Sequence, residues 1–314
     1  MRLLSFVIPC YRSEQTIEAV VAEIEGKMKT LSEYSWELIL VNDCSPDNTI
    51  AVIKSLADKD ERITVIDFAR NFGQHSALMA GLRQTKGDVV VCLDDDGQTP
   101  ADQVDRLLEA LDNGADVAYA SYSHKKHSAF RNFGSHVNEM MARFMLGKPK
   151  TLQVSSYFAA KRYIVNDMIR YENSYPYVIG LVLRSTNNIV NVPVDHRSRE
   201  IGSSGYTLKK LLGLWMNGFT SFSVKPLRMA TFIGLLAAIS GFIYGIVIIV
   251  QHFILPDRVQ GFASLAAILV FFGGMIMIML GLLGEYVGRI YISLNNSPQY
   301  VIKEIYSKEE KHVE

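Results

Sequence analysis

The chain has 314 residues, of which 49% are hydrophobic and only 20% charged, and its 32 Lys and Arg residues balance 32 Asp and Glu residues. This length allows one large domain or two small ones, and the low charge with a mean hydropathy of +0.13 indicates that part of the chain leaves water. The composition excludes disorder, collagen and coiled coil, and the balanced charge argues against nucleic-acid binding by broad phosphate neutralisation. Cys10, Cys44 and Cys92 lack the spacing of a disulfide framework or zinc site, which favours a reducing cytoplasmic environment.

The first half of the chain alternates short apolar runs with helical stretches. The N-terminal run is interpreted as a strand and not as a signal peptide, because Pro9 follows too soon and no small-residue cleavage site is present. The predicted strands are Leu3–Ile8, Glu37–Val41, Ile63–Phe68, Val89–Leu93 and Val117–Ala120. The predicted helices are Glu14–Leu31 after a Ser13 cap, Thr49–Ala57 after Asp47, Ser76–Gln84, and Ala101–Leu111 after Thr99 and Pro100. This alternation predicts a mainly parallel α/β sheet that binds ligands at the carboxyl ends of its strands.

The segments that follow the predicted strands contain no GxGxxG and no GxxxxGK[ST] motif, so neither a dinucleotide fold nor a P-loop is supported. Instead, the fourth strand ends in LDDDGQTP, where three consecutive carboxylates repel one another unless a cation binds. The period of a strand places Asp94 and Asp96 on one side and Asp95 on the other. Hard oxygen ligands at this spacing suit Mg²⁺ or Mn²⁺, which complete their shell with waters and phosphates. A solvated acidic loop is the alternative.

Two uncharged apolar stretches, Met229–Val250 and Gly261–Gly284, dominate the second half. Each exceeds the ~20 residues that carry a helix across a membrane, so two spans are predicted; a pair of buried core helices is the alternative. Ahead of them, apolar residues at helical spacing predict a helix lying in the membrane surface or, alternatively, packed on the soluble domain. These residues are Leu208, Leu211, Leu212, Trp215, Phe219 and Phe222.

Basic residues flank the predicted spans mainly on one side. Lys209, Lys210, Lys225 and Arg228 precede the first span and Arg289 and Lys303 follow the second, whereas the connecting loop has only Arg258 beside Asp257. The positive-inside rule therefore predicts that both termini are cytoplasmic. The expected organisation is a soluble domain over 1–205, an interfacial region over 206–228, spans over 229–250 and 261–284 joined by an extracytoplasmic loop over 251–260, and a juxtamembrane tail over 285–314.

Three motifs, VIPCYRSEQTI, VNDCSPDNT and LDDDGQTP, each follow a predicted strand, and with them the chain resembles the inverting glycosyltransferases of family 2. The segments ARNFGQHSALMAGL, REIGSSGY, FTSFSVKPLRM and LGEYVGRIY are similar to the polyprenyl-phosphate glycosyltransferases with two C-terminal membrane helices, a group with bactoprenol glucosyltransferases and dolichyl-phosphate mannose synthases. The resemblance runs from about Leu3 to Tyr300. It implies a GT-A fold, the α/β domain of nucleotide-diphospho-sugar transferases, with interfacial amphipathic helices and two transmembrane helices.

The resemblance also implies roles for individual residues. Those matching the nucleoside site are Pro9, Tyr11, Glu14, Asp43 and Asp95. Asp94 and Asp96 match the catalytic carboxylates that hold the metal and the diphosphate. The further donor contacts are Arg70, Gln74, Gln98, Ser204 and Arg199, the last of which is expected to clamp the diphosphate as a catalytic residue.

Two segments depart from the family pattern. Family members commonly carry a GDFR-like segment where this chain has SSYFAAKR from Ser155 to Arg162, and a Lys where it has Gly205. The identity of any general base therefore stays open. A lipid monophosphate with a second pKa near ~6 is already largely anionic near neutral pH and needs little help from a base. Five basic residues are candidates for contacting the lipid phosphate or anionic headgroups: Lys125, Lys126, Arg131, Lys209 and Lys210. The alternative is that they only keep the surface soluble.

These features predict a multi-pass enzyme of the inner (cytoplasmic) membrane. The resemblance implies that it transfers one sugar, with inversion, from a nucleotide sugar, with UDP-hexose as the expected donor, to polyprenyl (undecaprenyl) phosphate at the cytoplasmic face. It also suggests a homo-oligomer, for which a tetramer is one form. Two alternatives stay open: a processive polysaccharide synthase, disfavoured by only two spans and no QxxRW motif, and a non-catalytic membrane scaffold or flippase accessory subunit. The sugar itself is not predicted.

Overall fold

The structure is a computed structural model that describes residues 1–122, 143, 148–195, 225–254, 261–295 and 297–308. The chain forms two compact units. The first contains residues Met1–Leu211 together with Asn296–Glu314, and the second contains Leu212–Asn295. Several predicted features lie wholly or mostly outside the described residues. They are the interfacial region predicted over 206–228, described only from 225, the loop predicted over 251–260, described only to 254, and the site candidates Arg199, Ser204, Lys125, Lys126, Arg131, Lys209 and Lys210; residues 225–228 and 251–254 are helical.

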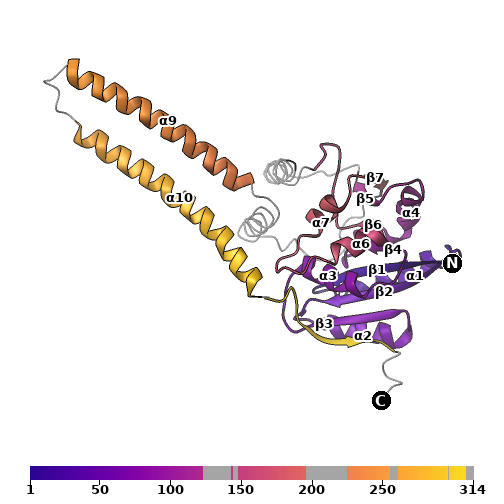
Figure 1. The fold of residues 1–314 in the computed structure, drawn as a ribbon. Helices are drawn as coiled ribbons and strands as arrows, with labels where there is room; N and C mark the ends of the chain where they lie inside the picture. Colours follow the sequence, from indigo (N-terminus) through magenta and orange to yellow (C-terminus); the bar gives the residue numbers. More distant parts are fainter. Residues whose placement is uncertain (123–142, 144–147, 196–224, 255–260, 296, 309–314) are drawn as a thin grey trace. The chain divides into compact units, whose positions relative to one another are not determined.

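The first unit is built on one mixed, mainly parallel sheet in the order β7-β5-β6-β4-β1-β2-β3-β8 (Figure 1). The strands are β1 (Arg2–Cys10), β2 (Tyr34–Asn42), β3 (Ile63–Phe68), β4 (Val89–Cys92), β5 (Val117–Tyr122), β6 (Phe158–Lys161), β7 (Ile189–Val194) and β8 (Ile302–Tyr306). β1 pairs in parallel with β2 and with β4, β2 with β3, and β5 with β7. β6 is antiparallel to β4 and β5, and β8 is antiparallel to β3.

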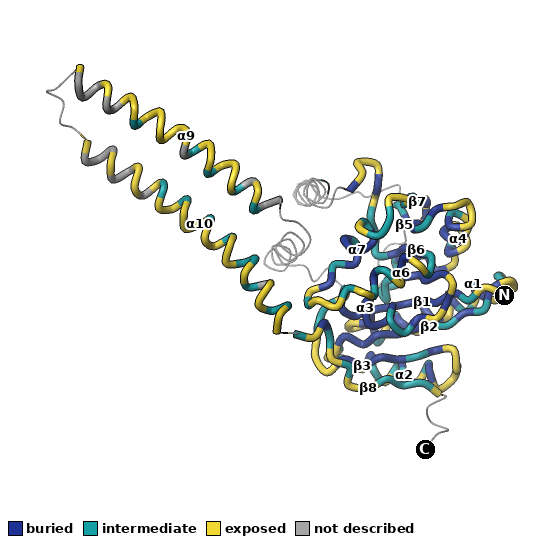
Figure 2. Tube along the Cα trace, in the orientation of Figure 1, coloured by how far each residue is buried: buried dark blue, intermediate teal, exposed yellow. Residues whose placement is uncertain are grey.

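Helices pack on both faces of this sheet. They are α1 (Ile17–Met28), α2 (Thr49–Lys59), α3 (Gln74–Gln84), α4 (Val104–Asp112), α6 (Arg162–Met168) and α7 (Val178–Ser185). α4 shows why these segments are helical, because Val104, Leu107, Leu108 and Leu111 recur at the spacing that puts them on one buried face. α1, α2 and α4 share one core with side chains from one face of β1 and β2. α3 packs on the opposite face, so the central strands are buried on both sides (Figure 2).

The predicted helix over Glu14–Leu31 is wrong at both ends. α1 begins at Ile17, with Thr16 and not Ser13 in the capping position. The physical reason is that the Ser13 hydroxyl donates to the carboxylate of Asp95, while only its backbone oxygen accepts from the amides of Thr16 and Ile17. The predicted helix over Ala101–Leu111 is also divided, since Ala101–Gln103 form a 3-10 turn before α4 begins at Val104.

The C-terminal segment contributes a strand that the sequence analysis did not predict. β8 lies within the segment described there as a juxtamembrane tail, yet it pairs along the outer edge of β3. The ion pair between Lys54 and Glu304, at 2.6 Å, adds a contact to α2. Because β7 and β8 belong to one sheet, the second unit is inserted in sequence between two strands of the first.

The second unit is a pair of long apolar helices, α9 (Lys225–Ile254) and α10 (Phe262–Leu294). Both are long and apolar enough to cross a membrane, over windows at Ala230–Val247 and Phe271–Leu294. None of the described side chains in these windows is buried, unlike those of a core helix in a soluble protein (Figure 2). α10 continues well beyond the predicted end of the second span at Gly284.

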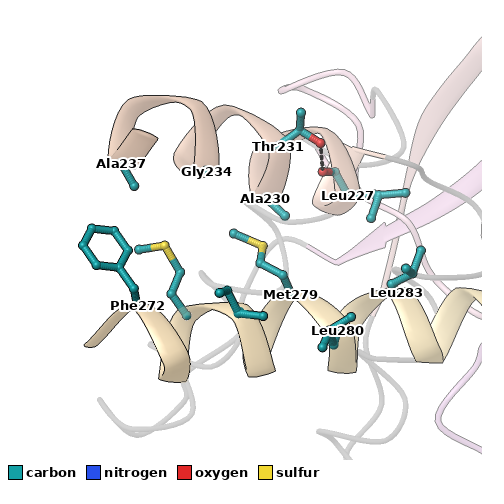
Figure 3. A pocket seen from close by; sticks show the side chains of 11 residues that line it. Leu227, Ala230, Thr231, Gly234, Ala237, Phe272, Met279, Leu280 and Leu283 are labelled. Carbon is teal, nitrogen blue, oxygen red and sulfur yellow. Dashed lines mark hydrogen bonds between the residues drawn. The ribbon is translucent and has the colours of Figure 1, made fainter. Parts of the chain in front are cut away.

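The two long helices are not tightly packed along their facing surfaces. A cavity of about 470 Å³ lies between them, with small α9 residues such as Ala230, Gly234 and Ala237 facing Phe272 and Met279 of α10 (Figure 3). The small residues leave room that the long α10 side chains do not fill.

Candidate functional site

The acidic segment after β4 lies at a switch point of the sheet. β1 has β2 on one side and β4 on the other, so the connections that leave these strands diverge. Ligands of open α/β sheets bind in the crevice that this divergence creates at the carboxyl ends of the strands. Residues that follow β1, β2, β3 and β4 contact one another here, as the following hydrogen bonds show.

Asp94 is held by two side chains from other parts of the chain. The Nε2 of Gln74 donates to its Oδ1 at 2.9 Å, and the hydroxyl of Ser156 donates to its Oδ2. Burial raises the pKa of Asp94 to about 6, opposed by the Ser156 hydrogen bond and reinforced by the negative charges of Asp96 and Asp95. The carboxylate is therefore oriented before any ligand arrives, in a place where negative charge is disfavoured.

Asp95 engages a different segment from Asp94. Its carboxylate accepts hydrogen bonds from the amide of Tyr11 at 3.0 Å and from the Ser13 hydroxyl, and its backbone oxygen accepts from Thr16 Oγ1 at 2.6 Å. Burial raises its pKa, and the Ser13 hydrogen bond opposes that shift. Asp95 thus ties the loop after β1 to the loop after β4. Asp96 accepts instead from the amide of Gln98, at 3.1 Å.

Asp43, directly after β2, is buried and fixes the loop after β3. Its two carboxylate oxygens accept from the amides of Phe72, at 2.6 Å, and Gly73, at 2.8 Å. Asn71 Nδ2 donates to its backbone oxygen at 3.1 Å. Burial raises the pKa of Asp43, and these amide hydrogen bonds partly offset the shift. Gly73 has φ of 89°, a conformation that favours glycine.

The remaining predicted site residues that the structure describes lie in the first strand and in the loops around the acidic segment. Pro9 lies within β1 opposite Val41, and Glu14 accepts from the Asn48 amide at 2.9 Å, which ties it to the loop before α2. Tyr11 is 46% exposed. The Arg70 guanidinium lies 4.6 Å from the centroid of the Phe72 ring.

Two non-glycine residues in this region have left-handed backbone conformations. Arg12 has φ of 60° and Cys44 has φ of 51°, and they lie in the loops after β1 and β2. Residues in such conformations are strained and cluster at functional sites. The Arg12 guanidinium also lies 5.6 Å from the centroid of the Tyr11 ring.

Ser156 and Tyr122 were missed as site residues. Ser156 precedes β6, in the segment that departs from the family pattern, and nothing in that segment's composition indicated a contact with Asp94. Tyr122 ends β5; burial raises its pKa, and the charges of Asp94 and Asp96 raise it further. Both residues reach the site through long-range pairings of β5 and β6, which local sequence patterns do not report.

The donor set suits a hard divalent cation. Asp94 and Asp96 supply carboxylate oxygens, and the closeness of Asp95 and Asp96 adds to the raised pKa of Asp94. Within the described part of the chain, no cluster of three or more His, Cys, Asp or Glu side chains could enclose a metal. Mg²⁺ or Mn²⁺ is commonly held by one or two carboxylates, with waters and substrate phosphates completing the shell. The residues present therefore fit such an ion bound together with a diphosphate.

The fold and the acidic switch point define a GT-A-like glycosyltransferase. The glucosyl-3-phosphoglycerate synthase of Mycobacterium tuberculosis, solved in complex with Mn²⁺ and UDP-glucose, superposes with a TM-score of 0.53. The likeness covers 70% of this chain and 77% of that one at 20% sequence identity, which establishes the fold.

The chain belongs to glycosyl transferase family 2, whose profile matches residues 5–169, and a second profile, the GtrB C-terminal hairpin, matches residues 225–290. The undecaprenyl-phosphate 4-deoxy-4-formamido-L-arabinose transferase of Yersinia enterocolitica is 31% identical over 99% of this chain and 95% of its own length. The enzyme of the same name from Pectobacterium atrosepticum is 32% identical, over 97% and 94%. An uncharacterized glycosyltransferase of Bacillus subtilis is 31% identical over 98% and 96%.

Proposed function

We propose that this glycosyltransferase moves a single sugar from UDP to undecaprenyl phosphate, with inversion at the anomeric carbon, at the cytoplasmic face of the membrane. The observation that carries the proposal is the combination, in one chain, of an acidic switch-point site with a hairpin able to cross a membrane. Similarity to undecaprenyl-phosphate sugar transferases over nearly the whole chain supports it. A soluble acceptor would give no reason for such an anchor, whereas an isoprenoid confined to the bilayer does.

The donor half of the site divides into two parts. Asp43, Tyr11 and Glu14 lie in the loops after β1 and β2, where they would contact the nucleoside. Asp94 and Asp96 would hold a Mg²⁺ or Mn²⁺ ion, which supplies positive charge that stabilises the departing nucleoside diphosphate. Gln74 and Ser156 keep the Asp94 carboxylate oriented for this role. Pro9, Arg70, Asp95 and Gln98 complete the part of the proposed donor site that the structure describes.

The acceptor needs little activation. A lipid phosphate oxygen attacks the anomeric carbon, the bond from that carbon to the β-phosphate oxygen breaks, and UDP leaves with the bonding electron pair. Because the second pKa of a phosphate monoester is near ~6, the attacking oxygen is largely anionic at neutral pH and no proton has to be removed. The departure of the segment from Ser155 to Arg162 from the GDFR-like family pattern is consistent with a reaction that needs no general base. Arg199 and Ser204 would contact the diphosphate, and the basic residues named above would meet the lipid phosphate or headgroups.

The topology of the sheet supports a cytoplasmic location of both termini. β7 precedes the hairpin and β8 follows it, yet both belong to one sheet, so the chain must cross the membrane an even number of times between them. Lys225, Arg228 and Lys303 lie on the cytoplasmic side in this arrangement. In intact cells, a membrane-impermeant thiol reagent should label Asp257→Cys but not Glu314→Cys. Labelling of Glu314→Cys alone would overturn this orientation.

The test is a transfer assay with the purified full chain in detergent. The protein is incubated with undecaprenyl phosphate, Mg²⁺ or Mn²⁺, and a panel of labelled UDP, GDP and dTDP sugars that includes UDP-glucose and UDP-4-deoxy-4-formamido-L-arabinose. We expect one UDP-sugar to yield a lipid that carries a single sugar, and Asp94→Asn to abolish it. Glu61→Gln, which removes an exposed carboxylate near the opposite end of β3, serves as the control. A polymer would indicate a processive synthase, and no transfer from any donor would indicate a non-catalytic scaffold; either result overturns the proposal.

A further inference from the structure

The segment from Gln299 to Tyr306, which follows α10 in sequence, is bound tightly to the sheet unit. We name Gln299–Tyr306 the C-terminal strap. Gln299 is buried, and its Nε2 donates to the backbone oxygens of Tyr171, at 3.0 Å, and Asn173, at 2.8 Å. The Tyr300 ring stacks on Phe68, with ring centroids 5.2 Å apart and planes 9° from parallel. Its hydroxyl oxygen accepts from Arg83 Nη1 at 2.8 Å. The strap thus holds the last residue of β3 and the last turn of α3.

The strap is in contact with the start of a loop in the candidate site. We name Arg70–Gln74, between β3 and the first residue of α3, the donor loop. The amide of Ala69, directly before it, donates to the backbone oxygen of Val301 at 3.0 Å. Phe68 contacts Phe72 edge to face, with centroids 5.7 Å apart. Tyr300, Phe68 and Phe72 therefore form a continuous aromatic row from the strap into the donor loop.

The donor loop in turn contacts both parts of the donor site. The amides of Phe72 and Gly73 donate to the carboxylate of Asp43, and Gln74 donates to Asp94. A shift of this loop would change two carboxylates at once, the one assigned to the nucleoside and the one assigned to the metal. Displacements of about an ångström are enough to reduce catalysis by ~10²-fold.

We propose that Tyr300 is a positioning residue for the donor site: through Phe68 and Phe72 it holds the donor loop in the conformation that orients Asp43 and Asp94. The inference rests on the proposed function for its consequence in catalysis. Its structural basis is the position of the stack, at the end of β3 from which the donor loop departs. Tyr306, the last residue of β8, pairs with Val65 farther back along β3 and donates to Asp58 of α2 at 2.6 Å. If the strap only stabilised the fold, replacing Tyr300 or Tyr306 would lower stability without a specific effect on the donor loop.

The test compares Tyr300→Ala with Tyr306→Ala, the same change near the two ends of the C-terminal strap, in the full chain in detergent. Three quantities are measured: amide hydrogen exchange of peptides covering 69–75, the Kd for UDP with Mn²⁺, and the KM values for donor and lipid. We expect Tyr300→Ala to speed exchange in the donor loop and to raise the UDP Kd and donor KM about tenfold, because a preorganised site binds more tightly than a loose one. The KM for the lipid should not change.

The controls separate positioning from folding. Tyr300→Phe keeps the stack on Phe68 and loses only the Arg83 hydrogen bond, so its exchange and donor binding should stay near those of the wild type. Tyr306→Ala should lower the melting temperature without changing exchange in the donor loop. If Tyr300→Ala lowers only the melting temperature and leaves loop exchange unchanged, the strap is merely structural and the proposal is wrong. Should the wild type bind no nucleotide, the proposed function fails, and loop exchange still decides the role of Tyr300.

Discussion

At the scale of single residues, the site depends on how Asp94 is held. We expect Asp94→Asn to reduce sugar transfer by a factor on the order of a hundred or more, as for loss of a main electrostatic stabiliser. Ser156→Ala removes one hydrogen bond to that carboxylate and should reduce transfer less, by roughly tenfold, whereas Ser156→Thr keeps the hydroxyl and should restore it. Titration of Mn²⁺ into the protein in the presence of UDP, followed by electron paramagnetic resonance, should show Mn²⁺ binding that is weakest in Asp94→Asn, intermediate in Ser156→Ala and close to that of the wild type in Ser156→Thr. Full transfer by the wild type in excess EDTA would remove the metal from the mechanism.

The imidazole of His75 makes the stability of the sheet unit sensitive to acid. Its ring packs edge-on against Tyr177, with centroids 5.1 Å apart, and its buried Nδ1 has no hydrogen-bond partner among the described residues. Burial lowers the pKa of His75 to about 4 from an ordinary value of 6.5. As pH falls from 6.5 towards 4, His75 is protonated in the unfolded chain but stays neutral in the folded chain. The contribution of His75 to the free energy of unfolding is therefore fully present above pH 6.5 and decreases as pH falls through this window.

The consequence can be measured by comparing wild type with His75→Phe. Between about pH 7.5 and about pH 5, this group should lower the unfolding free energy of the wild type by about 2 kcal/mol. His75→Phe should remove that part of the pH dependence, whatever its effect on stability at neutral pH. Chemical unfolding at several pH values, followed by tryptophan fluorescence, gives the slopes. Equal slopes for the two proteins would contradict the assignment to His75.

Residues of the candidate site could be predicted from the sequence where they form a recognisable local motif. Asp94, Asp95 and Asp96 were identified from their spacing and from the family resemblance, and they do lie at the switch point of the sheet. Ser156 was not, because its contact with Asp94 depends on β6 running antiparallel between β4 and β5. No local pattern contains that information.

At the scale of elements, α3 approaches the sheet more closely than a side chain would permit. A Cβ on Gly81 would lie 2.3 Å from Val7 Cγ1 and 3.2 Å from Val41 Cγ2. We expect Gly81→Ala to lower the unfolding free energy by about 1–3 kcal/mol through overpacking, even though alanine favours a helix. Gly26→Ala is the matched control, since Gly26 lies in α1 with nothing within 4 Å of the added Cβ.

The two glycine variants should therefore have opposite signs. Gly26→Ala should raise the unfolding free energy by up to about 1 kcal/mol, because alanine has the higher helix propensity. Both values follow from urea unfolding of the full chain in detergent at constant pH. A stabilising Gly81→Ala would mean that β1 and β2 can yield to the helix, contrary to the packing described here.

Elements with a strong local pattern were predicted and those defined by pairing were not. All five predicted strands are present, and Ile63–Phe68 has the predicted bounds. β6 has only 4 residues, β7 is interrupted by Asn191 and Pro193, and β8 carries charged residues along an outer edge, so none of these three unpredicted strands has the unbroken apolar run that identifies a buried strand. Helix ends were less accurate than helix positions, because side chains such as that of Ser13 serve the site and not the cap.

At the scale of the whole molecule, the hairpin is an insertion in a sheet and not an appendage at the end of the chain. β8 follows α10 and returns to pair with β3, so the sheet unit is completed only after both long helices have been synthesised. The donor loop lies between β3 and α3, directly beside that last strand. The loop that leads from β3 into the proposed donor site therefore gains its neighbouring strand only after the hairpin has been synthesised.

The long helices also carry surfaces suited to self-association. Gly241 and Gly245 in α9, like Gly284 and Gly288 in α10, lie four residues apart, and a Cβ at any of them would meet nothing within 4 Å in the described structure. Small residues at this spacing let helix backbones approach closely in lipid, where packing and not the hydrophobic effect drives association. We therefore expect a homo-oligomer that uses the Gly241 face of α9.

Gly241→Leu tests this surface, because a leucine there would keep two helix backbones apart. Light scattering of the purified protein in detergent should show the mass of an oligomer for the wild type and a shift towards the monomer for Gly241→Leu. Ser240→Leu, which places the same side chain one residue away on an exposed position of α9, should keep the wild-type mass. Since neither position belongs to the donor site, binding of UDP should be the same in both variants. An unchanged mass for Gly241→Leu would discard this face as the interface, and a monomeric wild type would discard self-association altogether.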